Sequence, residues 1–236
     1  MPGTTIVAAM LVNNEIGVIQ PVAELAALAR QAGALFLCDA VQGHGRVALP
    51  DADLIAISAH KIHGPKGIGA LWVRDGIRLQ PQMHGGGQEG GLRSGTLAPA
   101  LCVGFGVAAR LMAERAAADA EHVAMLHDRA LAALGEGWSV NGSLTDRYPG
   151  NLNVRRPGLD VARLISEVRD IAISAGSACA SGSGRPSHVL SALGLPAADA
   201  RSSIRIGFGR YTSIEEVDRA MERIRNAAIA QRPVAA

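Results

Sequence analysis

One lysine has the surroundings of a nucleophile. Lys61 lies in the run Ser58-Ala59-His60-Lys61-Ile62-His63-Gly64-Pro65, directly after the apolar segment 54–57. A lysine at the end of a buried strand is partly desolvated, and such an amine can lose its proton and attack a carbonyl. The neighbouring Ser58 and His60 are suited to holding a phosphate. Taken alone, the pattern fits a surface loop lysine equally well.

A carboxylate at the end of a neighbouring apolar run favours the reactive lysine. Asp39 follows the run 34–38. Enzymes that use pyridoxal phosphate need a carboxylate that keeps the pyridine nitrogen protonated, so that the ring can accept electrons. Packing does not explain an aspartate at this place, since a buried carboxylate needs a partner. Asp39 and Lys61 together indicate pyridoxal phosphate chemistry.

The three cysteines are far apart and include no Cys-x-x-Cys pair, which argues against a disulfide framework and against a zinc site. Cys38 and Cys102 lie in apolar strand and helix patterns, so we expect both to be small buried side chains. Cys179 lies in the glycine- and serine-rich run 176–184, which cannot pack as a core segment. We expect Cys179 to be an exposed, reactive thiol on a mobile loop.

The elements that would position these residues alternate between strands and helices. Helical spacing predicts a helix at 22–31. Continuous apolar runs predict strands, buried on both faces where the runs are longest, at 5–12, 34–38, 54–57 and 69–73. This order is typical of an α/β fold with a mainly parallel sheet and flanking helices, which binds ligands at the carboxyl ends of its strands. Six polar residues would converge on that edge of the sheet: Asn13, Asn14, Asp39, Ser58, His60 and Lys61.

The second half of the chain has a different pattern. A glycine-rich loop at 83–96 precedes a long Ala-rich helix, or a pair of helices, from 98 to about 134. Short strands are then predicted at 140, 151–154 and 171–174, and helices at 161–168, 186–193 and 213–230. This pattern indicates a smaller α+β domain. We therefore expect two domains, residues 1–116 and 117–236, with the boundary inside the long helix.

Composition excludes several classes of function. With 236 residues, 48% of them hydrophobic, the chain can bury a core. Its 23 basic and 21 acidic residues are spread along the sequence without the basic stripe of a nucleic-acid surface. No secretory signal is visible, and no apolar stretch reaches the roughly 20 residues of a membrane span. We expect a cytoplasmic protein that binds neither nucleic acid nor membranes.

Six motifs stand along the chain. They are VNNEIG at 12–17, DAVQ at 39–42, SAHKIHGPKG at 58–67, GGGQEGGLRSGT at 85–96, SAGSACAS at 174–181 and SIR at 203–205. In this order and at these separations they resemble the NifS/IscS-like cysteine desulfurases, and six motifs are far more specific than any one of them. The resemblance runs nearly end to end and implies the fold of the class V aminotransferases, which is fold type I of the pyridoxal phosphate enzymes.

The resemblance implies a role for each matching residue. Lys61 would hold pyridoxal phosphate as a Schiff base and move the proton at the substrate α-carbon. Cys179 would take the sulfur of L-cysteine as a persulfide, which releases L-alanine. The other implied roles are Asp39 at the pyridine nitrogen, Asn14 and Gln42 at the ring hydroxyl or the substrate, Ser58 and His60 at the phosphate, Thr96 at the phosphate of the partner in a homodimer, and Arg205 at the substrate carboxylate.

The implied partners are sulfur acceptors. A long flexible loop carrying the cysteine resembles the desulfurases that feed iron–sulfur scaffolds and tRNA-thiolation relays, because the sulfur must travel from the pyridoxal to another protein. No metal is implied.

Each role has a structural alternative. Asn14 could cap a turn, Gln42 could be a polar residue at a helix start, and Thr96 could cap the following helix. His60 could be a core histidine and Arg205 a surface charge. His63 and His84 are given no role.

The sequence departs from the family pattern at its N-terminus. It has no match to the earlier strands of the large domain, to the Gly/Ala-Thr phosphate turn or to the residue that stacks on the pyridoxal ring. A helix N-terminus normally supplies much of a phosphate site, and missing strands would expose a sheet edge and a sheet face. Two functions stay open: a desulfurase, acting on cysteine or selenocysteine, and a truncated, catalytically impaired relative that serves as a dimerisation or acceptor-binding module. The cysteine-bearing loop disfavours a third, another class V lyase.

Overall fold

The chain forms two compact units. The structure is a computed structural model, and it describes residue 3 and residues 5–176 and 187–231. The first unit comprises Met1–Val12 and Gln20–Ala116, and the second comprises Asn13–Ile19 and Ala117–Ala236. A short segment from near the N-terminus is therefore part of the second unit.

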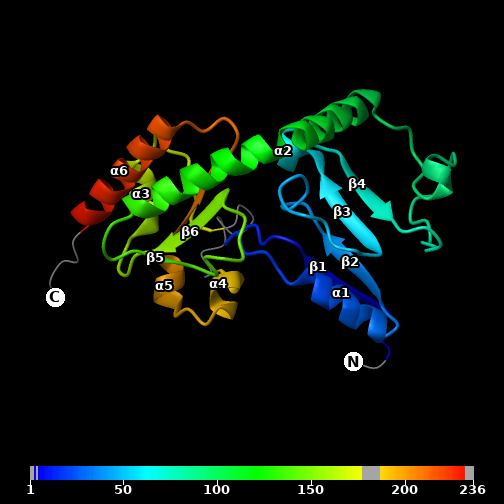
Figure 1. Cartoon of the computed structure of the whole chain (residues 1–236), viewed down its shortest axis with the longest axis horizontal. Coiled ribbons are helices and arrows are strands. Elements are labelled where there is room, and N and C mark those ends of the chain that lie inside the picture. The colour runs from blue at the N-terminus through cyan, green and yellow to red at the C-terminus, as the bar shows by residue number, and fades with distance from the viewer. Residues whose placement is uncertain (1–2, 4, 177–186, 232–236) are drawn as a thin grey trace. The chain divides into compact units, whose positions relative to one another are not determined.

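The first unit is built on a four-stranded sheet (Figure 1). Its strands lie in the order β1 (Ile6–Met10), β2 (Leu35–Asp39), β3 (Leu54–Ser58) and β4 (Gly69–Val73). The first three strands are parallel and β4 is antiparallel to β3. Helix α1 (Val22–Gln31) packs on β1 and β2. The predicted α/β fold with a mainly parallel sheet is confirmed.

The first strand is less buried than its apolar sequence predicts. We expected β1 to be buried on both faces, but Ile6 is 48% exposed, Met10 is 37% exposed and Ala8 between them is also exposed. Alternate residues of a strand point to opposite faces, so these three side chains share one open face. In the described residues β1 pairs only with β2, which makes it an edge strand.

A single long helix, α2 (Pro99–Ala133), follows the glycine-rich segment. Within that segment a one-turn 3₁₀ helix forms, η2 (Glu89–Gly91). The division between the two units falls inside α2. Its first half contributes Ala108 and Met112 to a cluster with Ile62 in the first unit, and its second half contributes to the core of the second unit.

The second unit holds a three-stranded antiparallel sheet, β5 (Ser139–Val140), β6 (Asn151–Arg155) and β7 (Ser203–Gly207). Helices α3 (Val161–Glu167) and α6 (Ile214–Ala230) pack together, and side chains from both join the core of this unit (Figure 1). Helix α6 starts with a capping box, in which Ser213 and Glu216 each accept from the other's backbone amide. The core is fully buried at Leu152, Val154, Leu164, Ile204, Met221 and Ile224.

Two details of the second unit were not predicted correctly. Residues 171–174 do not form a strand; only Ser174 makes an isolated bridge, with Arg205. Their apolar pattern arises because Ile171 and Ile173 pack against the core cluster. The short helix α5 (Ala197–Arg201), which follows α4 (His188–Ala192), was missed. None of the helices in the described part of the chain combines the length and apolar character needed to span a membrane.

Candidate active site

The carboxyl ends of two adjacent parallel strands carry the candidate cofactor residues. Asp39 ends β2 and Ser58 ends β3, and in the register between these strands Asp39 lies opposite Ala56. The backbone continues this pairing past the strand, because the amide of Ala40 donates to the carbonyl of Ala56 at 2.9 Å. The structure thus brings Asp39, Ser58 and the residues after Ser58 to one edge of the sheet.

Asp39 is solvent-exposed, contrary to the expectation of a buried carboxylate. Its Oδ1 accepts a hydrogen bond from the amide of Val41 at 3.0 Å, an Asx turn that fixes the carboxylate at the strand end. The residue before it, Cys38, is completely buried. Burial, reinforced by the charge of Asp39, raises the pKa of the Cys38 thiol to about 11. Cys38 is therefore a structural cysteine, as predicted.

Ser58 and His60 form a pair. The hydroxyl oxygen of Ser58 and Nδ1 of His60 are 2.8 Å apart. His60 is exposed, which excludes the alternative of a core histidine. A hydroxyl and an imidazole held side by side at a strand end suit the oxygens of a phosphate.

Lys61 lies on a short 3₁₀ helix, η1 (Ala59–Ile62), that continues directly from β3. Its side chain is half-buried. The next residue, Ile62, is buried in the cluster with Ala108 and Met112 and so anchors the turn. His63 closes η1 in the left-handed conformation, at φ 65°. The backbone that directly follows Lys61 is thereby fixed.

One residue near Lys61 was missed by the sequence reasoning. Arg46 donates from Nη2 to the backbone carbonyl of Lys61 at 2.6 Å. From Nη1 it donates to the carbonyl of Gln42 at 3.2 Å and, more weakly, to Oε1 of Gln42 at 3.4 Å. No motif marks Arg46. The available signal was a basic residue four positions after Gln42 in a glycine-containing turn.

Thr96 lies on the glycine-rich segment and is exposed. It does not adjoin the start of the helix that it was to cap, because α2 begins at Pro99. Among the described residues, no hydrogen bond links Thr96 to Asp39, Ser58 or Lys61. The segment is braced internally: the amide of Gly95 donates to Oε1 of Gln88 at 2.9 Å.

The second unit carries the other candidate residues, Asn14 and Arg205. Nη1 of Arg205 donates to the backbone carbonyl of Asn14 at 2.8 Å, and Nδ2 of Asn151 donates to the same carbonyl at 3.1 Å. Arg205 is half-buried on β7, which disfavours the alternative of a plain surface charge. The turn cap is Asn13 and not Asn14, because Oδ1 of Asn13 accepts from the amides of the two residues that follow Asn14.

A buried carboxylate lies beside these residues and was also missed. Glu15 is only 1% exposed, and its Oε1 has no hydrogen-bond partner within the described parts of the chain. Its backbone carbonyl accepts from Nδ2 of Asn153 at 3.0 Å. Gly176 packs so closely that a Cβ there would lie 3.0 Å from Oε1 of Glu15. The signal in the sequence was the glutamate of the Asn-Asn-Glu motif.

The cysteines Cys179 and Cys102 have different outcomes. Cys179 falls within 177–186, outside the described residues. Cys102 is exposed on α2, so the prediction that it is buried is wrong. The Ala-rich pattern did not show which face of the long helix is covered.

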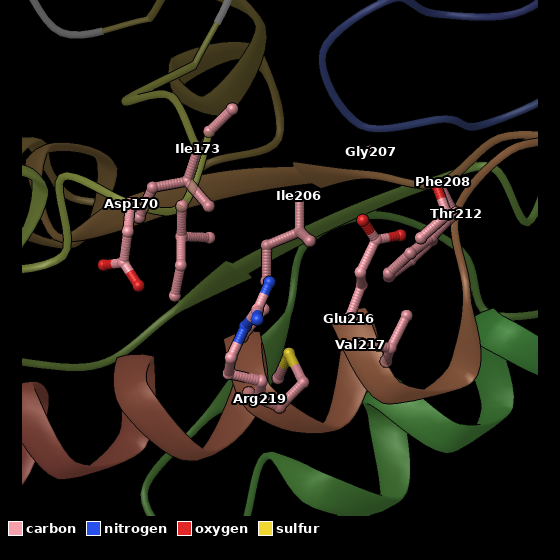
Figure 2. A pocket seen from close by; sticks show the side chains of 13 residues that line it. Asp170, Ile173, Ile206, Gly207, Phe208, Thr212, Glu216, Val217 and Arg219 are labelled. Carbon is pink, nitrogen blue, oxygen red and sulfur yellow. The ribbon is translucent and has the colours of Figure 1, made fainter.

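A pocket of about 240 Å³ is present within the second unit (Figure 2). Asp170, Glu216 and Arg219 line it together with apolar side chains such as Ile173 and Ile206. It contains none of the candidate residues and does not extend the candidate site. Elsewhere in the described residues, no cluster of three or more His, Cys, Asp or Glu side chains is suited to a metal ion.

Comparison with known proteins now decides the family. The profile of the class V aminotransferases matches residues 1–220 of the chain. The chain belongs to this family. Class V relatives include the mitochondrial cysteine desulfurase of Saccharomyces cerevisiae, 49% identical over 225 residues, and the cysteine desulfurase IscS of Colwellia psychrerythraea, 48% identical over 232 residues.

These matches cover 92% and 95% of this chain but 45% and 57% of the two relatives. The chain thus spans about half the length of the curated relatives it matches. Among solved structures, a NifS-like protein superposes with a TM-score of 0.85 at 32% identity, over 94% of this chain and 60% of that one. The class V assignment and the fold therefore agree.

Proposed function

We propose that the chain supplies the lysine, the cofactor residues and the substrate residues of a pyridoxal-phosphate-dependent cysteine desulfurase. The observation that carries the proposal is the grouping of Asp39, the Ser58–His60 pair and Lys61 at the carboxyl edge of β2 and β3. The names of the curated relatives support the same activity. In this proposal residues 1–116 are the remainder of the large cofactor-binding domain, apart from Asn13–Ile19, which group with the second unit, and residues 117–236 are the small domain.

The donor set fits pyridoxal phosphate in chemistry. The cofactor has a ring nitrogen that a carboxylate stabilises when protonated, a phosphate that hydroxyl and imidazole groups can bind, and an aldehyde that an amine can attack. Asp39, the Ser58–His60 pair and Lys61 match these in turn. When bound, the cofactor supplies a ring that accepts electrons from the substrate.

The identity of the nucleophile is constrained by composition. The sequence contains two lysines, Lys61 and Lys66. Lys66 is exposed in the Gly-Pro turn, whereas Lys61 is half-buried on η1 beside the strand end. An amine held beside the strand end is placed to attack an aldehyde bound there. Lys61 would therefore hold the cofactor and carry the proton at the substrate α-carbon.

The substrate residues would come from the second unit. Arg205 would bind the carboxylate of L-cysteine with its planar fork, and Asn14 would hydrogen-bond the substrate. The Cys179 thiolate would attack the sulfur of the bound cysteine. The carbon–sulfur bond breaks, a sulfur–sulfur bond forms on Cys179, and the three-carbon fragment takes up a proton and leaves as L-alanine.

The persulfide would then pass to an acceptor. We propose an iron–sulfur scaffold or a tRNA-thiolation relay protein, in line with the relative named IscS. The active form would be a cytoplasmic homodimer, in which the exposed Thr96 reaches the phosphate bound by the partner.

The test compares two single lysine variants in the purified full-length protein. Lys61→Ala should abolish the visible absorbance of bound pyridoxal phosphate, while Lys66→Ala should keep it. Cys179→Ser should keep the absorbance and lose sulfide release from cysteine. Absorbance that survives Lys61→Ala refutes the assignment, and a protein that binds no cofactor would instead be the non-catalytic module.

A further inference from the structure

We propose that Arg46 is a positioning residue that holds Lys61 and Gln42 in a fixed relation. The inference rests on the proposed function. The guanidinium uses both of its outer nitrogens, Nη2 on the carbonyl of Lys61 at 2.6 Å and Nη1 on Gln42 at 3.2 and 3.4 Å. One side chain thereby joins the segment after β2, which carries Gln42, to the segment after β3, which carries Lys61.

The turn that carries Arg46 is held in place by backbone hydrogen bonds and by packing. It lies in a tight turn in which the amide of Gly43 donates to the carbonyl of Ala40 and the amide of Arg46 donates to the carbonyl of Gly43, both at 3.0 Å. Gly43 is pressed against the core, since a Cβ there would lie 2.5 Å from Cδ2 of Leu11. The position of Arg46 relative to β2 is therefore set by backbone bonds and packing.

Lys61 needs this contact because η1 is so short. The last carbonyls of a helix have no partner within the helix, and a one-turn 3₁₀ helix leaves most of its carbonyls in that state. The amide of Gly64 satisfies the carbonyl of Ala59 at 2.9 Å. The carbonyl of Lys61 is satisfied by Arg46 instead. This bond fixes the peptide from which the lysine side chain extends.

The contact to Gln42 sets the direction of its amide. A guanidinium only donates hydrogen bonds, so the atom of Gln42 that faces Arg46 is the oxygen Oε1. The Nε2 group is then left to donate to an acceptor such as the ring hydroxyl of the cofactor. Because the guanidinium is planar, the two bonds also fix the separation of Gln42 and Lys61. Lysine at position 46 would keep the charge but could not bond both partners in this geometry.

The experiment uses Arg46→Met and Arg46→Lys in the full-length protein, with Arg110→Met as the matched control. Arg110 lies on α2 in the same unit, is 62% exposed and pairs with Glu114. Three properties are measured. They are the amide hydrogen exchange of residues 59–64 in the cofactor-free protein, the dissociation constant for pyridoxal phosphate, and the pH at which the visible absorbance of the bound cofactor changes.

For Arg46→Met we expect exchange at residues 59–64 to accelerate, and cofactor affinity to fall roughly 10- to 100-fold, since a hydrogen bond from a charged donor is lost at each partner. The pH midpoint of the absorbance change should shift. Arg46→Lys should retain the fold and show an intermediate loss of affinity, and Arg110→Met should match the parent protein in all three measurements.

Two results would overturn the inference. In one, the Arg46→Met protein keeps the parental affinity for pyridoxal phosphate and the parental pH midpoint, and only its melting temperature falls. This result would show that the hydrogen bonds of Arg46 are merely structural. If that variant does not fold, an Arg46→Lys protein with parental affinity overturns it equally. Failure of the proposed function is distinguishable, because it would appear as cofactor absorbance that survives Lys61→Ala, while exchange in the cofactor-free protein still reports the bond between Arg46 and Lys61.

Discussion

Nη1 of Arg205 lies 2.8 Å from the backbone carbonyl of Asn14, and this hydrogen bond joins two residues that are 191 positions apart in the sequence. The same carbonyl also accepts from Asn151. Arg205, the candidate carboxylate-binding residue, is therefore fixed at both ends. Its backbone belongs to strand β7, and its guanidinium is hydrogen-bonded to the Asn14 carbonyl. A preorganised guanidinium loses little conformational freedom when a carboxylate binds.

Arg205→Lys should weaken cysteine binding without removing the cofactor. A lysine keeps the charge but lacks the bidentate fork, so we expect the KM for cysteine to rise about 10- to 100-fold while the absorbance of bound pyridoxal phosphate is retained. Steady-state kinetics with Arg201→Lys, an exposed arginine on α5, as the control would check this. An unchanged KM for cysteine would show that Arg205 does not bind the substrate carboxylate.

Gly176→Ala should destabilise the protein. Gly176 has φ +118°, and a Cβ would lie 3.0 Å from the buried Oε1 of Glu15. Strain and crowding together should cost roughly 1–3 kcal/mol in the free energy of unfolding, measured with urea. Gly158→Ala is the control, since it has φ +77° with nothing within 4 Å and so introduces conformational strain alone. Equal losses of unfolding free energy in the two variants would mean that the contact between the added Cβ and Glu15 does not destabilise the protein.

The two described cysteines, Cys38 and Cys102, should be alkylated at very different rates. The pKa of Cys38, raised to about 11 by burial and by Asp39, leaves roughly one thiol in a thousand ionised at pH 8, and that thiol is also inaccessible. Cys102 is exposed. In a Cys179→Ser background, mass spectrometry after iodoacetamide should find Cys102 modified at least about 100-fold faster than Cys38. Comparable rates would contradict the buried position of Cys38.

His127 should make the protein less stable as the pH falls. The residue is only 5% exposed, and burial, with a smaller contribution from the charge of Arg147, lowers its pKa although Asp128 opposes this. The unfolded chain therefore binds a proton more readily, so stability is lost as the pH drops below about 6.5, with a slope of at most about 1.4 kcal/mol per pH unit. His127→Gln should reduce the difference between the unfolding free energies at pH 7.5 and pH 5.5. An identical difference in both proteins would contradict the assignment.

Local patterns predicted the elements of the first unit well. The helix at 22–31 and the strand at 69–73 have the predicted bounds. Their signals are short-range: helical spacing in one case, and an apolar run bounded by glycine and charge in the other. The carboxyl-edge placement of Asp39 and Ser58 followed from the same patterns, because parallel strands end on one side of a sheet.

Other features depend on contacts that no local pattern encodes. The exposure of β1 depends on which strand and helix pack beside it, and the exposure of Cys102 depends on which face of α2 is covered. The assignment of Asn14 to the second unit depends on hydrogen bonds from Asn151 and Arg205, far along the chain. Arg46 belongs to no motif that we used, and only its hydrogen bonds reveal it. Glu15 lies in the Asn-Asn-Glu motif, but no local pattern shows that its carboxylate is buried.

The most direct test of the central claim is to locate the covalently held cofactor. The purified full-length protein, loaded with pyridoxal phosphate, is reduced with borohydride, and the modified peptide is sequenced by tandem mass spectrometry. The given sequence has two lysines, and the modified peptide distinguishes them directly. We predict that the pyridoxyl group is on Lys61 and is absent after Lys61→Ala. A group attached to Lys66, or a protein with no modified lysine, would contradict the account.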